Sequence, residues 1–402
     1  MPDKPYTHFV RLFPQGNYFF GNENYSDSEQ RAFYFQKSRA FPQQTTLLGL
    51  IRYQLLLQND MLVPEKGRKR IASNKAAALI GDTSFAPLSR ESSEIPSFGA
   101  IEAISPVLLV RNNGSQYAPF PAFKDWEKDE NKWSVSEHTF HVPALKESPP
   151  KLRASLSKTN YLNSFPQWGA YDVKKDIEWG FRNLEDGSFL PYGAVFETTE
   201  PQIGIYKTQK LTHRQKKDRR EREGFFKMHF QRMKKEYGFG FYLRLDLLRL
   251  DPLQKIQLES QAAVIIGKER SVFRMEVEEV GNVLAPLPSL QPSFTSGNRI
   301  WLAGPARLDL SRVYEFCQTV VSREISFRCI QTSVRNTNNY HGKLSRQKQQ
   351  ASPFLSQRYN LLDAGSLLVL KTSLSQDEQD RFSEILADPV FSSIGYNHYL
   401  TY

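Results

Sequence analysis

The chain has 402 residues, enough for two or three domains because a single core usually stops growing near about 250–300 residues. Its 40% apolar content, with 28 Phe, 18 Tyr and 5 Trp, excludes a wholly disordered chain, and its two cysteines exclude a disulfide framework. The net charge of +10 is concentrated between Lys207 and Lys235, where twelve basic residues stand with three acidic ones, against 41 basic and 40 acidic residues elsewhere. No apolar run approaches the roughly 20 residues that cross a bilayer, and no signal-peptide pattern opens the sequence. We therefore expect a cytoplasmic protein without a membrane partner.

The first third of the chain contains a strand pattern and then the clearest helix pattern. Residues 7–14 alternate as a strand does, and a polar, glycine-containing loop follows them. The segment 40–60 carries apolar residues every four positions at Leu47, Ile51 and Leu55, which predicts an amphipathic helix with Thr45 or Thr46 as its N-cap. Residues 64–98 are rich in Lys, Ser, Ala and Pro and are interpreted as a long insertion outside the core.

The middle of the chain combines short strand patterns with irregular stretches. Residues 98–112 and 116–123 predict two strands around an Asn-Asn-Gly-Ser turn. The pattern from about 125 to 191 is irregular, with several Trp and Pro residues, as in insertions that cover a sheet. Strand patterns at 202–209 and 238–248 flank the basic residues from Lys207 to Lys235, which we call the basic block.

The last third repeats this layout. Residues 262–280 predict two strands around a glycine turn, and another strand pattern begins at residue 299. Residues 308–320 predict an amphipathic helix capped by Asp309 or Ser311, and strand patterns follow at 325–332 and 359–371. Two rounds of strand, helix and strands predict an α+β protein with two units, each an antiparallel sheet covered by helices.

The sequence contains no recognisable catalytic motif. His138 and His141 stand three residues apart, but no helical pattern or carboxylate makes them a metal pair, so we expect no metal and no cofactor. Cys317 falls on the helix expected at 308–320 and Cys329 in a strand. Both are interpreted as buried small apolar side chains rather than nucleophiles.

Basic, small and turn-forming residues at the ends of predicted elements point instead to a polyanion. The free N–H groups where a helix starts at Thr45 and Thr46 favour a phosphate, and Arg52 lies about two turns further on. Gly267, with Lys268 and Arg270, forms a basic turn between apolar strands, where glycine permits a close approach of ligand and backbone. An ordinary cap, an ordinary hairpin and a solvated charged segment are the alternatives. Together with the basic block, these positions favour a surface that follows the backbone of single-stranded RNA or DNA. The candidate contacts within the block are His213, Arg214, Lys216, Lys217, Arg219 and Arg220.

The same residues carry a family resemblance. The run RAFPQQTTLLGLIRYQLL, residues 39–56, resembles the signature "F-P-P-P-x-T-hydrophobic-G-hydrophobic-R" of RAMP proteins, with Gln43 and Gln44 where the family tends to have prolines. More narrowly, it is similar to the subunit of type III-B (Cmr) CRISPR effectors that holds the 5′ handle of the CRISPR RNA (crRNA). Segments similar to further family motifs follow in the family's order: ISPVLLVRNNGSQYAPFPAFKD, EPQIGIYKTQKLTHR, IIGKERSVFRMEV, LLDAGSLLVL and IGYNHY. Handle-binding subunits of type III-A and III-D complexes are close relatives.

This resemblance implies two ferredoxin-like (RRM-like) modules with antiparallel sheets and insertions. We expect an N-terminal module at 1–206, with insertions at about 64–98 and 125–191, the basic insertion at 207–235, and a C-terminal module at 236–402. The resemblance further implies a non-catalytic subunit that binds the crRNA 5′ handle and joins the large polymerase/cyclase-like subunit to a filament of backbone RAMP subunits. Phe41, Phe225 and Phe226 are candidates for stacking on nucleobases, with burial in the core as the alternative.

Two other functions stay open from the sequence. A metal-independent RAMP endoribonuclease that processes CRISPR RNA precursors needs a general base or acid, for which His213 is the better placed histidine and His8 the weaker one. An adaptor whose basic block binds an acidic protein surface is the third possibility.

Overall fold

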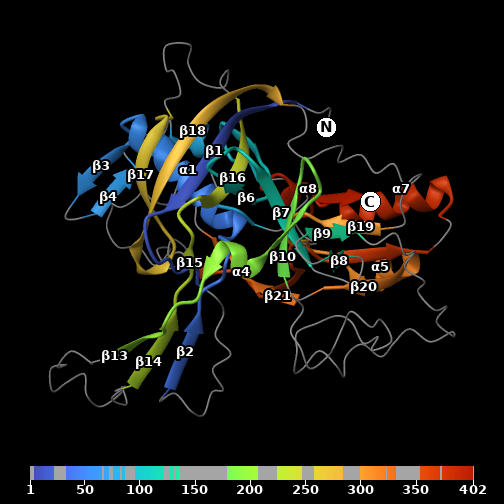
Figure 1. The fold of residues 1–402 in the computed structure, drawn as a ribbon. Helices are drawn as coiled ribbons and strands as arrows, with labels where there is room; N and C mark the ends of the chain where they lie inside the picture. Colours follow the sequence, from blue (N-terminus) through green and yellow to red (C-terminus); the bar gives the residue numbers. More distant parts are fainter. Residues whose placement is uncertain are drawn as a thin grey trace, which may run out of the picture.

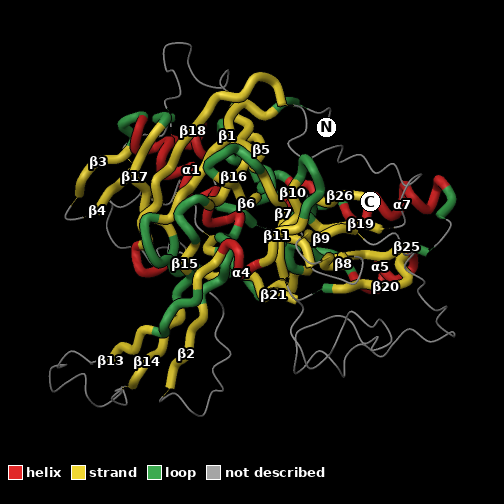
Figure 2. The backbone as a smooth tube through the Cα atoms, in the orientation of Figure 1, coloured by secondary structure: helices red, strands yellow, loops and turns green. Residues whose placement is uncertain are grey.

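The structure is a computed structural model, and it describes residues 4–21, 33–65, 68–71, 76–81, 84–86, 96–121, 126–129, 132–135, 179–206, 224–246, 258–283, 299–322, 324–331, 354–371 and 374–401. In these residues the fold is mixed α+β and rich in strands, as the sequence predicts (Figure 1). Helices form a small part of this portion of the chain (Figure 2). None of the described helices is both long and apolar enough to span a membrane.

A nine-stranded sheet forms the centre of the molecule. Eight of its strands follow the order β11-β10-β7-β6-β16-β1-β18-β17, and β5 also pairs with β16. Their bounds are β1 (Tyr6–Pro14), β5 (Ile101–Ile104), β6 (Leu108–Arg111), β7 (Gln116–Pro121), β10 (Trp179–Asn183), β11 (Phe189–Pro191), β16 (Tyr237–Leu245), β17 (Gln261–Ile266) and β18 (Ser271–Val283). Strand β1 pairs antiparallel with β16 on one side and β18 on the other, so this sheet takes strands from both sides of the boundary expected at residue 236.

Helix α1 (Gln44–Gln58) covers one face of this sheet, at the place where the four-residue period predicts a helix. Leu47, Ile51 and Leu55 are fully buried in a core that also contains Val10 and Phe273 from the sheet. Each such side chain contributes roughly 1.5–3 kcal/mol of transfer free energy, so the apolar period holds the helix on the sheet. Helix α2 (Ala76–Ile80) packs beside α1.

The segment 64–98 is not wholly outside the core, which corrects the expectation for it. It contains α2 and the hairpin of β3 (Leu62–Glu65) and β4 (Arg68–Ile71). Leu79, Phe85 and Phe98 are buried in the same core as α1. Their apolar side chains are separated by polar stretches, so no period reveals them in the sequence.

A second sheet occupies the C-terminal part, in the order β20-β25-β19-β26. Along the chain the elements are β19 (Arg299–Leu302), α5 (Leu310–Phe316), β20 (Cys317–Val321), β25 (Leu367–Leu370), α7 (Gln376–Leu386) and β26 (Tyr399–Thr401). The Asp309 carboxylate caps α5 by accepting from the Ser311 N–H, as predicted. The position predicted for Cys317 is wrong, because α5 ends at Phe316 and Cys317 begins β20.

The remaining elements are short. A three-stranded sheet consists of β13 (Gln202–Tyr206), β14 (Gly224–His229) and β2 (Phe33–Lys37), in that order. Four further strand pairs are β8 (Trp126–Asp129) with β9 (Lys132–Val135), β12 (Phe196–Glu197) with β15 (Arg232–Met233), β21 (Glu324–Phe327) with β24 (Tyr359–Leu362), and β22 (Ile330–Gln331) with β23 (Phe354–Leu355). A short 3-10 helix, η3 (Lys268–Arg270), forms the turn between β17 and β18. The short helices are α4 (Tyr192–Val195) and α8 (Pro389–Ser392). Cys329 lies between β21 and β22, and both cysteines are buried as expected.

The C-terminal unit, which we define as residues 299–401, shares part of its core with the nine-stranded sheet. Phe391, Ile394 and Tyr396, on and just after α8, are fully buried in the core cluster that contains α1. On the other face of the sheet, the Trp301 indole packs edge-on against Phe120 at 4.8 Å between ring centroids. The two units are therefore packed together through apolar side chains on both faces of one sheet.

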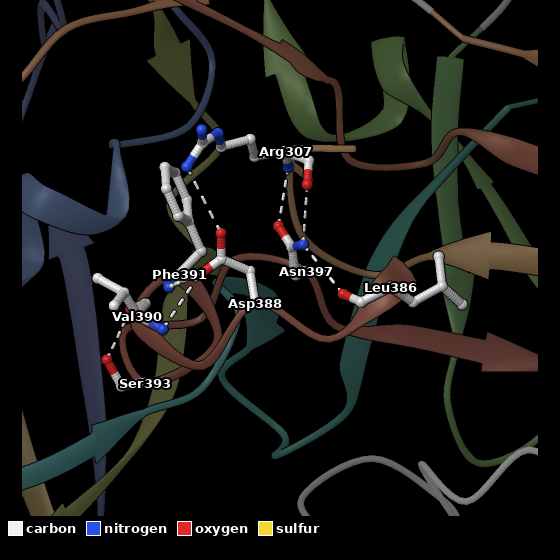
Figure 3. A network of polar contacts seen from close by, with 7 residues as sticks. All are labelled: Arg307, Leu386, Asp388, Val390, Phe391, Ser393 and Asn397. Atoms are coloured by element: carbon white, nitrogen blue, oxygen red, sulfur yellow. Dashed lines mark hydrogen bonds and ion pairs between the residues drawn. The ribbon is translucent and has the colours of Figure 1, made fainter. Parts of the chain in front are cut away.

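A polar network holds α8 in place (Figure 3). The Asp388 carboxylate accepts from the N–H groups of Val390 and Phe391, and it lies 3.7 Å from the Arg307 guanidinium, which stacks on the Phe391 ring. The Asn397 side chain accepts from the Arg307 N–H and donates to the carbonyl oxygens of Arg307 and Leu386. These contacts fix both ends of the segment that enters the core.

Candidate RNA-binding surface

The three-stranded sheet extends away from the body of the molecule and carries the basic block (Figure 1). Strands β13 and β14 pair antiparallel, with Tyr206 opposite Gly224, so the two ends of the segment 207–223 lie side by side. Within the described part of the block, Lys227 is exposed on β14 and Arg232 forms an ion pair with Glu197 at 2.9 Å. The described flanks of the basic block thus lie on a projecting sheet.

Six candidate contacts of the block lie outside the residues that the structure describes: His213, Arg214, Lys216, Lys217, Arg219 and Arg220. The same holds for the side chains of Phe225, Phe226 and Lys268, and for the whole of His138 and His141. Phe230, at the foot of the projecting sheet, packs edge-on against Phe19 at 5.4 Å between ring centroids.

The Gly267 turn has the predicted position between two apolar strands. Gly267 has φ 80° and ψ −179°, a conformation that only glycine adopts readily, and an alanine Cβ there would lie 2.6 Å from the Phe19 carbonyl oxygen. Arg270 is exposed and also has a positive φ, of 53°. Glycine is therefore required here because the turn lies very close to another part of the backbone. That backbone is at Phe19 of the same chain and does not belong to a ligand.

Tyr18, Phe19 and Phe20 join several of these parts. The Tyr18 backbone bonds with Gln231 in both directions, which ties it to the foot of the basic block. The Phe20 carbonyl accepts from the Arg39 N–H, just before α1, and the Tyr18 hydroxyl donates to the Ala40 carbonyl at 2.8 Å. The turn at Gly267, the foot of the block and the entry to α1 thus meet on one three-residue segment.

The burial of this segment is not predicted from the sequence, because its neighbours along the chain are polar and loop-forming. All three aromatic side chains are 3% exposed or less, and Phe20 stacks on Phe273 of β18. Three consecutive aromatic residues inside a polar stretch were the available signal, since a loop of that composition has no other reason to carry them.

The start of α1 differs from the prediction. The N-cap is Gln43, whose carbonyl accepts from the N–H groups of Thr46 and Leu47, and neither Thr45 nor Thr46 caps the helix. Burial raises the pKa of the Tyr396 hydroxyl, which has no hydrogen-bond partner within the described part of the chain.

The α1 N-terminus therefore faces the 394–396 segment closely. The Gln44 side-chain amide lies against the carbonyl oxygens of Ile394 and Gly395. Gly395 has φ 91°, and a Cβ there would lie 2.4 Å from the Ser105 carbonyl oxygen, which leaves no room for a larger residue. Thr45 and Thr46 themselves are half-buried.

Arg52 and Phe41 are engaged within the protein. The Arg52 guanidinium lies 5.2 Å from the centroid of the Phe98 ring, and burial lowers its pKa to about 10. The Phe41 ring packs against Phe239 at 5.2 Å and against Phe181 at 5.9 Å between centroids. The alternative of core packing therefore describes Phe41 better than a free stacking platform does.

Comparison with known proteins gives one family match and several similar solved chains. A family model described as CRISPR-associated protein (Cas_Cmr3) matches residues 10–401. No curated protein is similar enough to match the chain.

Two similar solved chains come from cryo-EM structures of the type III-B Cmr-beta complex. A chain from the complex bound to cognate target RNA is 12% identical to this chain, with a TM-score of 0.45. The chain with cognate target RNA and AMPPnP in state 1 is 13% identical with a TM-score of 0.43. Each alignment covers 98% of this chain and 96% of the other. A chain of the Csm3–Csm4 subcomplex of the type III-A CRISPR-Cas interference complex is 8% identical with a TM-score of 0.33, and the alignment covers 90% of this chain and 93% of that one.

Proposed function

The chain belongs to the Cas_Cmr3 family of CRISPR-associated proteins, and on that premise we propose that it is an RNA-binding subunit of a type III-B (Cmr) effector ribonucleoprotein. In this proposal it binds the 5′ handle of the crRNA and joins the large polymerase/cyclase-like subunit to the backbone RAMP subunits. The family match over residues 10–401 carries the proposal, because it spans the nine-stranded sheet, the basic block and the C-terminal unit.

Charge supports RNA as the ligand. The basic block holds a local excess of +9 in a chain whose remainder is nearly neutral, and its described flanks form a projecting sheet. Lys and Arg that neutralise phosphates supply most of the affinity for a nucleic-acid backbone. The exposed Arg270 lies at a turn that packs on Phe19, which in turn contacts the foot of the block.

Strand order supports the proposal of two ferredoxin-like modules. The order β18-β1-β16-β5, with α1 between β1 and β5, is the order 4-1-3-2 of a β-α-β-β-α-β unit. The C-terminal order β26-β19-β25-β20, with α5 and α7 as the two helices, follows the same scheme. Modules of this kind present a sheet or loops to single-stranded RNA.

A non-catalytic role agrees with the surroundings of His8. This residue is 7% exposed in β1, and its ring Nδ1 lies 2.7 Å from the Thr7 hydroxyl oxygen. A ring so enclosed does not reach the 2′-hydroxyl of an RNA substrate, which a general base must do. His213 is the histidine on which the endoribonuclease alternative depends.

The test is incubation of the purified chain with CRISPR repeat RNA in EDTA. Salt-sensitive binding without cleavage supports the handle-binding subunit. Cleavage that His213→Ala abolishes supports the endoribonuclease, and the absence of both supports the adaptor. Replacing Lys268 and Arg270 by Ala should make the dependence of log affinity on log salt shallower by about 0.7 for each phosphate contact removed from a single strand.

A charge reversal tests the block itself. Changing Lys216, Lys217, Arg219 and Arg220 to Glu lowers the local balance from +9 to +1, so RNA binding at low salt should fall sharply. The matched control reverses four basic residues outside the block and changes the net charge equally: Lys4, Arg312, Arg358 and Arg381. Equal losses in both variants would mean that net charge, rather than a local footprint, governs binding.

A further inference from the structure

Strand β17 is an open edge of the nine-stranded sheet. It pairs with β18 on one side, and no described strand pairs with its other side. The opposite edge of the sheet is different, because β11 is three residues long, ends at Pro191 and is followed directly by α4. Within the described ranges, the outward-facing N–H and C=O groups of β17 have no strand partner, so they can pair with another extended chain.

The sequence of β17 lacks the features that protect edge strands. Residues 261–266 read Gln-Ala-Ala-Val-Ile-Ile, with no charged residue and no proline. Edge strands in soluble proteins are normally protected by Lys, proline, bulges or short length, and an uncharged apolar edge is prone to pair with other strands. An edge strand of this composition does not lead to aggregation when another protein covers it.

Exposed apolar residues and paired charges lie together on the sheet face beside this edge. Ile265 is 61% exposed and lies opposite Val272, which is 46% exposed. The nearest cation on this face, Arg274, is 3.2 Å from the Glu276 carboxylate and stacks on the Phe13 ring. The charge of Arg274 on this face is therefore compensated by Glu276.

We propose that β17 binds an extended, uncharged segment of a neighbouring protein subunit, which adds to the sheet as a further strand and places apolar side chains on Ile265 and Val272. This strand contact rests on the proposed function, because the neighbour is taken to be another subunit of the same ribonucleoprotein. Main-chain hydrogen bonds give such a contact its affinity, and alternate side chains give it its specificity.

The size of the edge decides against a second copy of this chain. A stable interface between two proteins buries about 800 Å² on each partner and uses about 20–30 residues a side. A strand of six residues falls well short of that by itself. The occupant must therefore be held by further contacts, as a subunit within a larger assembly is.

Hydrogen exchange on the co-purified complex tests the proposal. Amides of residues 261–266 should exchange about tenfold more slowly, or slower still, in the complex than in the free chain, because a strand pair protects the outward-facing N–H groups. Equal exchange in both states would overturn the proposal. So would protection in the free chain that rises with its concentration, which identifies a second copy, or protection produced by the crRNA alone. The RNA content of the complex is measured separately, so a complex without crRNA refutes the proposed function and not the strand contact.

A pair of isoleucines supplies the matched variants. Ile265→Lys should remove one protein subunit from the co-purified complex, whereas Ile330→Lys, at an isoleucine that is 62% exposed on β22, should not. Both side chains are exposed, so the thermal midpoint of the free chain should stay unchanged in each variant. Retention of every subunit by Ile265→Lys would count against the contact.

Discussion

Gly267→Ala tests the close approach between the β17–β18 turn and Phe19. The backbone conformation of Gly267, φ 80° and ψ −179°, costs a residue with a Cβ about 1–3 kcal/mol. The clash adds to this, since the new Cβ would lie 2.6 Å from the Phe19 carbonyl oxygen, which belongs to a fully buried residue and has little freedom to move. We expect a loss of at least about 2 kcal/mol in the free energy of unfolding.

The measurement is urea unfolding of the free chain, with Gly281→Ala as the matched control. Gly281 lies in the same hairpin on β18, without a positive φ and with nothing within 4 Å of a Cβ. Its replacement should change the unfolding free energy by less than about 0.5 kcal/mol. If the two alanine variants are equally stable, the turn does not pack tightly against Phe19. The inferred connection from the turn through Phe19 to the foot of the basic block would then be refuted.

Three further predictions concern the core and the start of α1. Phe391→Ala should cost about 3–5 kcal/mol and reduce hydrogen-exchange protection in α1 as well as in the C-terminal sheet, whereas Phe382→Ala, in a core made by the C-terminal unit alone, should leave α1 protected. Unchanged protection of α1 in Phe391→Ala would mean that the two units do not share a core. Replacing Thr45 and Thr46 together by Ala should alter stability by less than about 0.5 kcal/mol, because neither side chain caps the helix, and a loss near 1 kcal/mol in thermal unfolding would restore the capping role. Burial raises the pKa of the Cys317 thiol, so a thiol reagent at pH 8 should label it only as the protein unfolds, and rapid labelling of the native chain would contradict its burial.

Local signals in the sequence predict the elements whose residues are neighbours along the chain. The four-residue apolar period predicts α1, and the capping residue Asp309 predicts the start of α5, because both depend on contacts within one or two turns. Helix α7 is not predicted, since only Phe382, Ile385 and Leu386 of its eleven residues are buried. A capping box of Ser375 and Glu378 marks its start and was an available signal.

Contacts between distant parts of the chain are what the sequence does not reveal. The Gln44 side chain at the start of α1 lies against the Gly395 carbonyl oxygen, 351 positions away in the sequence, and no local pattern links the two. Three aromatic residues within a polar loop form the segment that joins the turn, the block and α1, and their burial depends on β16 and β18. The resemblance to RAMP proteins compensates for part of this, because a family carries its long-range contacts with it.

The order in which the strands of the nine-stranded sheet are synthesised has a consequence for how the protein forms. Strand β1 lies between β16 and β18, and His8 pairs with Leu243, so this strand has neither of these partners until about 235 further residues have been translated. At about 5–20 residues per second this interval is roughly 10–50 seconds, far longer than the collapse of a small chain. Throughout it the apolar side chains of Phe9, Val10 and Leu12 lack the part of their native cover that β16 and β18 supply. The nascent chain should therefore be a substrate for chaperones that bind extended apolar segments, and yields of the protein should depend on translation speed more than its native stability suggests.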